Sequence, residues 1–197
     1  MSHYFTNDEH THDYRSIKYE LNGTSYIFKT DAGVFSRNNV DFGSDLLIKT
    51  VIDDASKHNP TSMIDMGTGY GVISIVLSDQ LNIEATAVDV NLNALALTKQ
   101  NAKKYNVTTT SREDYDHAQI TTDLYITNPP FRAGKSIVME IIEDAHKRLV
   151  QDGHFYMVVQ KKQGMPSYKK AIEQLFNNVE TVGKSKGYYI LKAIRRV

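Results

Sequence analysis

Residues 62–80 read SMIDMGTGYGVISIVLSDQ, and this stretch decides the fold class. Residues 62–66 are apolar enough to form a buried strand, and residues 72–80 have the spacing of a helix. A glycine-rich turn separates the two. Because strands that alternate with helices are typical of α/β proteins, the stretch predicts a parallel sheet covered by helices.

Strands and helices continue to alternate around this stretch. The sequence predicts further strands at 83–90, 107–111, 124–127 and 154–160, and helices at 44–57, 92–105, 136–150 and 168–176. Two last strands, 179–184 and 187–193, are joined by a short loop. They are therefore expected to pair antiparallel at one edge of the sheet.

The chain opens with a predicted β-hairpin. Asn22-Gly23 is the dipeptide that best supports a tight hairpin turn, and it lies between the apolar residues of 17–21 and 25–29. No internal repeat or interdomain linker follows. We therefore expect one compact unit.

The composition excludes several classes of protein. Lys plus Arg and Asp plus Glu are balanced at 23 each, so the net charge does not indicate a nucleic-acid partner, and any basic surface must be local. The absence of cysteine excludes disulfides, thiolate metal sites and thiol nucleophiles. No apolar stretch approaches the ~20 residues of a membrane span, and the polar start is not a signal peptide. We expect a soluble cytoplasmic protein.

The loop that contains Gly67, Gly69 and Gly71 is a candidate binding site, because glycines let a ligand approach the backbone closely. The dinucleotide fingerprint requires a small residue where this chain has Val72, so a pyrophosphate site is not expected. Asp65 precedes the loop and places a carboxylate where an ammonium group would be held. This pattern indicates a nucleoside that carries an amino acid.

The ends of the next two strands supply the remaining contacts for such a ligand. Asp89, followed by Val90, is placed to accept hydrogen bonds from both ribose hydroxyls. Asp114 or Glu113, after the strand at 107–111, is placed to accept from an adenine amino group. S-adenosylmethionine contains all three of these parts.

The turn Asn128-Pro129-Pro130-Phe131 follows another predicted strand. Two prolines fix the backbone, so the Asn128 side-chain oxygen and the Pro129 carbonyl are expected to accept the two N–H groups of a planar amine. Phe131 is then placed to stack on the ring that carries the amine. The alternative interpretation is a turn without a catalytic role, because paired prolines are common turn signals.

Together these motifs resemble the class I S-adenosylmethionine-dependent methyltransferases that act on planar amines. Four further segments look like the 16S (small-subunit) ribosomal RNA guanine-N2 methyltransferase family: residues 28–36 (FKTDAGVFS), 41–43 (DFG), 132–135 (RAGK) and 160–164 (QKKQG). The resemblance runs from Tyr4-Phe5 to Tyr188. The best-known members carry a second, degenerate copy of the domain, and this chain matches the catalytic half.

The resemblance implies a fold and an activity. The fold is a doubly wound, seven-stranded, mainly parallel sheet with an antiparallel last strand, the Rossmann-like methyltransferase fold. We expect residues 1–43 to form the hairpin and a segment that covers the cofactor, in which Gly33, Phe35 and Phe42-Gly43 take part. Residues 44–197 form the expected catalytic domain.

The implied reaction is transfer of a methyl group from S-adenosylmethionine to the N2 amine of guanine, with S-adenosylhomocysteine as product and without a metal. Ribosomal RNA or the small ribosomal subunit is the implied partner, not DNA or a membrane. Arg132, Lys135 and Lys161 flank the motifs and are expected to contact phosphates. The histidines have no paired metal-ligand spacing, and we assign them no role.

Other functions fit the same turn. A release-factor glutamine amide and the N6 amine of adenine are also planar amines, although release-factor methyltransferases usually carry tyrosine where this chain has Phe131. A binding module that keeps the fold without catalysis, such as an RNA-binding assembly factor, is a third possibility. The intact Asp65, Asp89 and Asn128 favour an enzyme.

Overall fold

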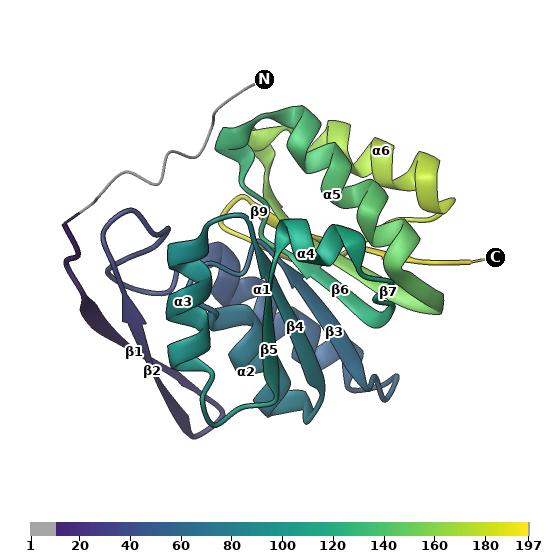
Figure 1. Cartoon of the computed structure of the whole chain (residues 1–197). Coiled ribbons are helices and arrows are strands. Elements are labelled where there is room, and N and C mark those ends of the chain that lie inside the picture. The colour runs from purple at the N-terminus through teal and green to yellow at the C-terminus, as the bar shows by residue number, and fades with distance from the viewer. Residues whose placement is uncertain (1–10, 197) are drawn as a thin grey trace.

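A seven-stranded sheet forms the middle layer of the protein in the computed structural model, which describes residues 11–196 (Figure 1). Its strands are β3 (Ser62–Met66), β4 (Glu84–Asp89), β5 (Val107–Ser111), β6 (Thr122–Thr127), β7 (Leu149–Gln160), β8 (Glu180–Ser185) and β9 (Tyr188–Ile194). They lie in the order β5-β4-β3-β6-β7-β9-β8, and β9 is antiparallel to both of its neighbours. This confirms the predicted fold class, including the antiparallel last strand.

Helices cover both faces of the sheet. α1 (Phe42–Ala55), α2 (Val72–Leu81) and α3 (Leu92–Asn101) pack on one face, and α4 (Arg112–His117), α5 (Lys135–Arg148) and α6 (Met165–Phe176) pack on the other. Successive residues of a strand serve opposite cores: Met63 belongs to the first and Ile64 to the second. A strand that is covered by helices on both faces needs apolar side chains on both sides, so its sequence is a continuous apolar run and does not alternate with polar residues. No helix of the described residues is long and apolar enough to cross a membrane.

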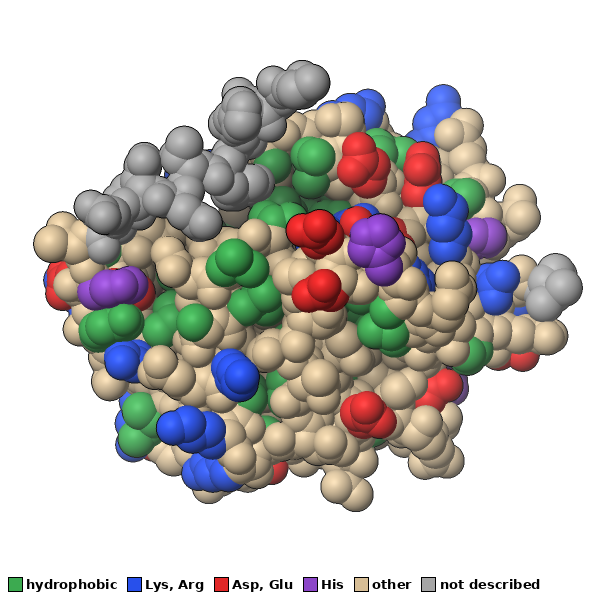
Figure 2. Space-filling model, viewed as in Figure 1, with side chains coloured by type: hydrophobic (Ala, Val, Ile, Leu, Met, Phe, Trp, Pro, Cys, Tyr) green, Lys and Arg blue, Asp and Glu red, His purple; other side chains and the backbone are tan. Residues whose placement is uncertain are grey.

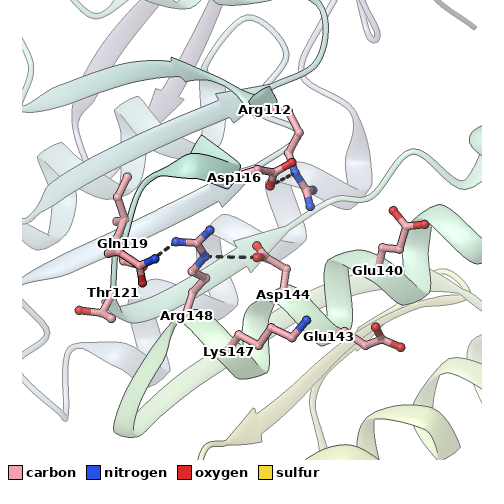
Figure 3. Close-up of a pocket in the computed structure, with 10 residues that line it drawn as sticks. Arg112, Asp116, Gln119, Thr121, Glu140, Glu143, Asp144, Lys147 and Arg148 are labelled. Carbon is pink, nitrogen blue, oxygen red and sulfur yellow. Dashed lines mark hydrogen bonds and ion pairs between the residues drawn. The ribbon is translucent and has the colours of Figure 1, made fainter. Parts of the chain in front are cut away.

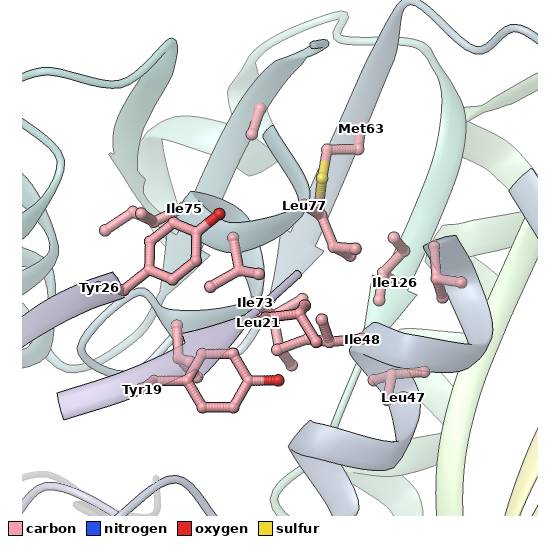
Figure 4. Packing of buried hydrophobic residues seen from close by; sticks show 14 of the residues in the cluster. Tyr19, Leu21, Tyr26, Leu47, Ile48, Met63, Ile73, Ile75, Leu77 and Ile126 are labelled. Atoms are coloured by element: carbon pink, nitrogen blue, oxygen red, sulfur yellow. The ribbon is translucent and has the colours of Figure 1, made fainter. Parts of the chain in front are cut away.

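The predicted hairpin is present as β1 (Arg15–Leu21) and β2 (Thr24–Thr30). Both residues of its turn have positive φ, which is the geometry that Asn-Gly favours. Tyr19, Leu21 and Tyr26 of the hairpin pack against α1 and α2 (Figure 4). The hairpin is therefore joined to the main core. Tyr4-Phe5 and the other residues of 1–10 lie outside the described part of the chain.

Three short elements were not predicted: α4 and two single turns of 3-10 helix, η1 (Phe131–Ala133) and η2 (Lys161–Gln163). α4 has six residues and buries only Tyr115, so it has no repeated apolar spacing. β7 also begins earlier than expected, because Leu149 already pairs with Thr122 of β6. The predicted helix that ended at residue 150 therefore ends at Arg148.

The parallel strands place the motifs of the sequence together. The glycine loop follows β3, Val90 follows β4, Glu113 and Asp114 follow β5, the Asn128 turn follows β6, and Lys161 follows β7. The carboxyl ends of parallel strands lie at the same edge of the sheet, which is the edge where α/β proteins bind ligands. We call it the carboxyl edge below.

Candidate active site

The glycine loop bends tightly over the end of β3. Gly67, Gly69 and Gly71 have φ of +80°, +60° and +98°, a region that residues with a Cβ atom rarely adopt. The amides of Gly67 and Thr68 donate to the carbonyl of Val88, at 2.8 and 3.0 Å. A Cβ atom at Gly71 would lie only 2.9 Å from the Thr98 methyl group. The three glycines are thus required by the backbone.

Two polar residues of α3, which the sequence analysis did not identify, hold this loop. The Thr98 hydroxyl donates to the carbonyl of Gly69 at 2.8 Å. The Asn101 amide donates to the carbonyls of Tyr70 (2.8 Å) and Lys29 (3.0 Å) and accepts from the Lys29 amide. The sequence did contain a signal for these residues: Thr98 and Asn101 are polar, lie three positions apart and fall on an otherwise apolar helix face. Asn101 therefore connects the hairpin to the loop.

Asp65 is completely buried at the end of β3. One of its oxygens, Oδ2, accepts from the Thr68 hydroxyl (2.8 Å) and the Ser74 amide (3.1 Å). The other, Oδ1, has no hydrogen-bond partner among the described residues. Burial raises the pKa of this carboxyl to about 7, and the charge of Asp89 adds to the effect. An unpaired buried oxygen is costly, so this atom fits a cationic ligand group such as an ammonium.

Asp89 ends β4 and faces the same loop. Its two oxygens each accept one backbone hydrogen bond, from the amides of Gly69 and Asn91, both at 2.9 Å. Burial raises the pKa of Asp89, and the backbone donors oppose part of that shift. Each oxygen retains one lone pair for a ligand hydroxyl. Val90 and Leu92 beside it are 50% and 56% exposed, which leaves an apolar surface next to the carboxylate.

Glu113 and Asp114 lie in the first turn of α4 and are both exposed. The Asp114 carboxylate accepts from the Ser111 hydroxyl at 2.8 Å, and the Ser111 oxygen accepts from the Asp114 amide at 3.1 Å. These bonds cap the helix. Acidic side chains gather where Figure 1 draws α4, as the space-filling view shows (Figure 2). This part of the surface repels phosphate groups.

The Asn-Pro-Pro-Phe turn is more compact than the sequence suggested. Pro130 has φ −77° and ψ 78°, and the Phe131 amide donates to the Pro129 carbonyl at 2.9 Å. This is an inverse γ-turn. The Pro129 carbonyl thus already has one donor and one remaining lone pair. The ring of Phe131 packs against Tyr168, with centroids 5.8 Å apart.

The Asn128 side chain is held by the start of α1. Its Nδ2 donates to the Ser44 hydroxyl oxygen at 3.0 Å and lies 3.4 Å from Oδ2 of Asp41. A carboxylate only accepts hydrogen bonds, so the amide nitrogen must be the atom that faces Asp41. The Asn128 oxygen accepts no hydrogen bond from the described residues, and it remains an acceptor for a ligand.

The other predicted site residues lie at or near the surface. Arg132, Lys135 and Lys161 are exposed, and Lys135 donates to the Ser167 hydroxyl at 2.8 Å. Phe35 is 70% exposed in the loop between β2 and α1. Phe42, which the resemblance assigned to the segment over the cofactor, lies beside Asp41 and packs against Tyr188, with ring centroids 5.2 Å apart.

The fold also gathers Asp54, His58 and His154, whose ligand atoms lie within 4.8 Å of one another. Asp54 and His154 are 100 residues apart, so spacing along the chain could not indicate the group. The Asp54 carboxylate already accepts from Lys192 (2.7 Å) and the Tyr156 hydroxyl (2.6 Å). The buried ammonium of Lys192 opposes a metal cation there, and we assign no metal to this cluster.

A cavity of about 490 Å³ lies between α4, α5 and the segment before β6 (Figure 3). Its buried carboxylate, Asp144, accepts from the hydroxyls of Tyr115 and Tyr125, both at 2.7 Å, and from Arg148 at 3.3 Å. Arg112 is paired with Asp116. These polar groups satisfy one another and leave no atom that requires a ligand.

Comparisons with known proteins agree with this geometry. Residues 25–192 match the family model of the methyltransferase small domain. The uncharacterized protein YbxB of Bacillus subtilis (strain 168) is 38% identical over 182 residues, which cover 89% of each chain.

Two ribosomal RNA methyltransferases are also similar. Large subunit methyltransferase G of Aeromonas salmonicida is 28% identical over 89% of this chain, and small subunit methyltransferase C of Cronobacter sakazakii is 27% identical over 84%. Each match covers 48% of the relative, so this chain spans about half their length.

A solved structure shows the same fold. It is the T. Thermophilus 16S rRNA N2 G1207 methyltransferase in complex with AdoMet and guanosine, with a TM-score of 0.80 and 24% identity. The match covers 93% of this chain and 51% of that one. The family match over most of the chain, the glycine loop and the incomplete carboxylate agree: this protein belongs to the methyltransferase small domain family of S-adenosylmethionine-dependent methyltransferases.

Proposed function

We propose that this protein methylates the exocyclic N2 amine of a guanine in small-subunit ribosomal RNA. The proposal depends on two acceptor atoms that lie at the ends of the neighbouring strands β3 and β6. Oδ1 of Asp65 and the side-chain oxygen of Asn128 each lack a hydrogen-bond donor among the described residues. The first suits a cationic cofactor and the second suits an amine. The names of the relatives, which include methyltransferases of both ribosomal subunits, support RNA as the substrate.

The cofactor contacts follow from the strand ends. Asp65 would hold the ammonium group of S-adenosylmethionine, and Asp89 would accept from the ribose hydroxyls with its remaining lone pairs. Gly67, Gly69 and Gly71 would let the cofactor lie against the backbone. Val90 would contact the adenine ring, and Asp114 or Glu113 would accept from its amino group. Phe35, in the segment before α1, would cover the cofactor.

The bound cofactor supplies an electrophilic sulfonium methyl group and leaves as S-adenosylhomocysteine, so the reaction needs no metal. The guanine N2 forms the new bond to carbon as the sulfur–carbon bond breaks, and the electron pair of that bond stays on sulfur. Asn128 accepts from the amine and orients its lone pair, while N2 then loses one proton to solvent. Alignment and the fixed acceptor supply most of the catalysis.

RNA would approach from the side of Arg132, Lys135 and Lys161, because these exposed cations flank the catalytic turn while the surface of α4 is acidic. A base inside a duplex must leave the stack to reach Asn128, which costs a few kcal/mol. Phe131 would contact the extruded base with the part of its ring that Tyr168 leaves open. We place this reaction in the cytoplasm, where ribosomal subunits are assembled.

The deciding experiment is transfer of labelled methyl from S-adenosylmethionine to small subunits, large subunits, naked ribosomal RNA and release factors in parallel. Nucleoside digestion then identifies the product. We expect N2-methylguanosine from the small subunit. Label recovered in large-subunit RNA, in methyladenosine or in protein would show that the proposed substrate is wrong. If calorimetry shows that this protein binds no S-adenosylmethionine, it is a non-catalytic RNA-binding factor.

A further inference from the structure

The start of α1 contacts the catalytic turn through side chains that are more than 80 residues distant in sequence. From these contacts we propose that Asp41 and Ser44 are positioning residues, which fix the Asn128 amide so that its oxygen is presented to the acceptor amine. The proposal rests on the proposed function and adds two residues to its site. Neither residue touches the reacting atoms.

The contacts specify one orientation of the amide. Each hydrogen of the Asn128 NH₂ group has an acceptor: the Ser44 hydroxyl at 3.0 Å and Oδ2 of Asp41 at 3.4 Å. A rotation by 180° would place the Asn128 oxygen against the Asp41 carboxylate, where two acceptors repel. The amide therefore has a defined direction before any substrate binds.

The supporting residues are themselves held rigidly. Oδ2 of Asp41 accepts from the Ser44 amide at 3.1 Å and caps α1, and Ser44 is only 4% exposed. Between them, a Cβ atom at Gly43 would lie 2.9 Å from the Tyr188 ring and 3.1 Å from Asp41. The ring of Tyr188, from β9, thus packs against the first turn of α1 at Gly43. A site held by packed elements keeps its geometry better than one held by a loop.

The arrangement also makes Asn128 a better acceptor. An amide whose N–H groups donate, one of them toward a carboxylate, is polarised so that more negative charge lies on its oxygen. Helix capping does not explain Ser44: its hydroxyl is bound to Asn128 and to no other side chain of the described residues, while the cap requires only Asp41.

The test combines kinetics with a spectroscopic signal. Ser44→Ala removes one acceptor, and Asp41→Ser keeps a capping side chain that is too short to reach Asn128. We expect Ser44→Ala to lower kcat by about 5- to 10-fold, the loss of one neutral hydrogen bond, and Asp41→Ser to lower it by at least as much, because its acceptor is a carboxylate. Neither variant should change S-adenosylmethionine affinity. The side-chain NH₂ resonances of Asn128 in a ¹⁵N-labelled sample are expected to shift in both variants.

Ser78→Ala is the matched control. Ser78 is also 4% exposed, and its hydroxyl donates to the Ile83 carbonyl at 2.6 Å, at the far end of α2. It should leave both kcat and the Asn128 resonances unchanged. In an Asn128→Ala background, Ser44→Ala should cause no further loss of kcat, because the residue that it positions is gone.

Three results separate the proposals. If Ser44→Ala and Asp41→Ser leave the Asn128 resonances and kcat at their original values, the positioning role is wrong. If Ser44→Ala lowers kcat equally with and without Asn128, Ser44 is only structural. If Asn128→Ala alone keeps full activity, the catalytic role proposed for Asn128 is wrong. The resonance shifts then still show whether Ser44 and Asp41 hold the Asn128 amide.

Discussion

Asp65 and Asp144 are both buried carboxylates, on opposite sides of the sheet, and their surroundings differ in one respect. Asp144 is completed within the chain by two tyrosine hydroxyls and Arg148. Within residues 11–196, Asp65 has no cationic partner and keeps one oxygen without a donor. A carboxylate that stabilises the fold is fully paired in the free protein, whereas one that binds a ligand is left incomplete. The comparison predicts that changes at Asp144 alter stability and changes at the carboxyl edge alter binding and catalysis.

The largest effect is expected from Asp144→Ala. It leaves the largely covered Arg148 without its counter-charge and two tyrosine hydroxyls without their acceptor, so the free energy of unfolding should fall by about 3–5 kcal/mol. Urea denaturation measures the loss. S-adenosylmethionine affinity, measured at a temperature where the variant is folded, should stay within about twofold. An unchanged unfolding midpoint would show that Asp144 does not stabilise the fold and would contradict the difference proposed between Asp144 and Asp65.

Asp65→Asn should have the opposite effect on stability. Because the folded pKa of Asp65 is raised to about 7, its contribution to stability is present below the unfolded pKa of about 4 and is lost as the pH rises to about 7. The variant should therefore match the original protein near pH 4 and exceed its stability at pH 8, by on the order of 2–4 kcal/mol.

Asp65→Asn should also change how S-adenosylmethionine binding depends on pH. Binding of an ammonium group favours the ionised carboxylate, so S-adenosylmethionine affinity should rise with pH up to about 7 and binding should release a proton. Calorimetry in buffers of different ionisation enthalpy measures that proton. In Asp65→Asn the affinity should be lower and the pH dependence due to this group absent. Equal affinity for both proteins would contradict the assignment.

Asn128→Ala should lower the rate of methyl transfer at least ~100-fold while cofactor affinity is kept, by analogy with the loss of one preorganised polar contact. Unfolding should change much less than in Asp144→Ala, because Asn128 is only partly buried. Single-turnover transfer and urea denaturation of the same preparation give both quantities. Turnover comparable to that of the original protein would exclude Asn128 from catalysis.

The smallest effect is expected from Tyr125→Phe. It removes one of three donors to Asp144 and should lower the free energy of unfolding by about 1.5 kcal/mol, since the acceptor is charged. Methyl transfer should be unchanged. A loss of activity without a loss of stability would show that the Asp144 network is coupled to the carboxyl edge.

The sequence by itself determined the order of the elements, because each depends on a short-range pattern. The central strands β3, β6 and β7 contain apolar runs, the hairpin follows from Asn22-Gly23, and the glycine loop follows from backbone angles that only glycine adopts readily. Once strands and helices alternate in a parallel sheet, the motifs after them must lie at one edge. α4 was not predicted, because five polar residues around one buried tyrosine have no periodic pattern.

The tertiary structure alone decided which polar groups are paired and which are left free. The contacts of Asn128 with Asp41 and Ser44, and those of Asn101 with the hairpin and the glycine loop, join residues that are between 31 and 87 positions apart. Such contacts depend on strand order, register and side-chain direction, which no local pattern contains. For the same reason, the sequence could name Asp65 as a candidate but could not show that one of its oxygens is unpaired while every oxygen of Asp144 is bound.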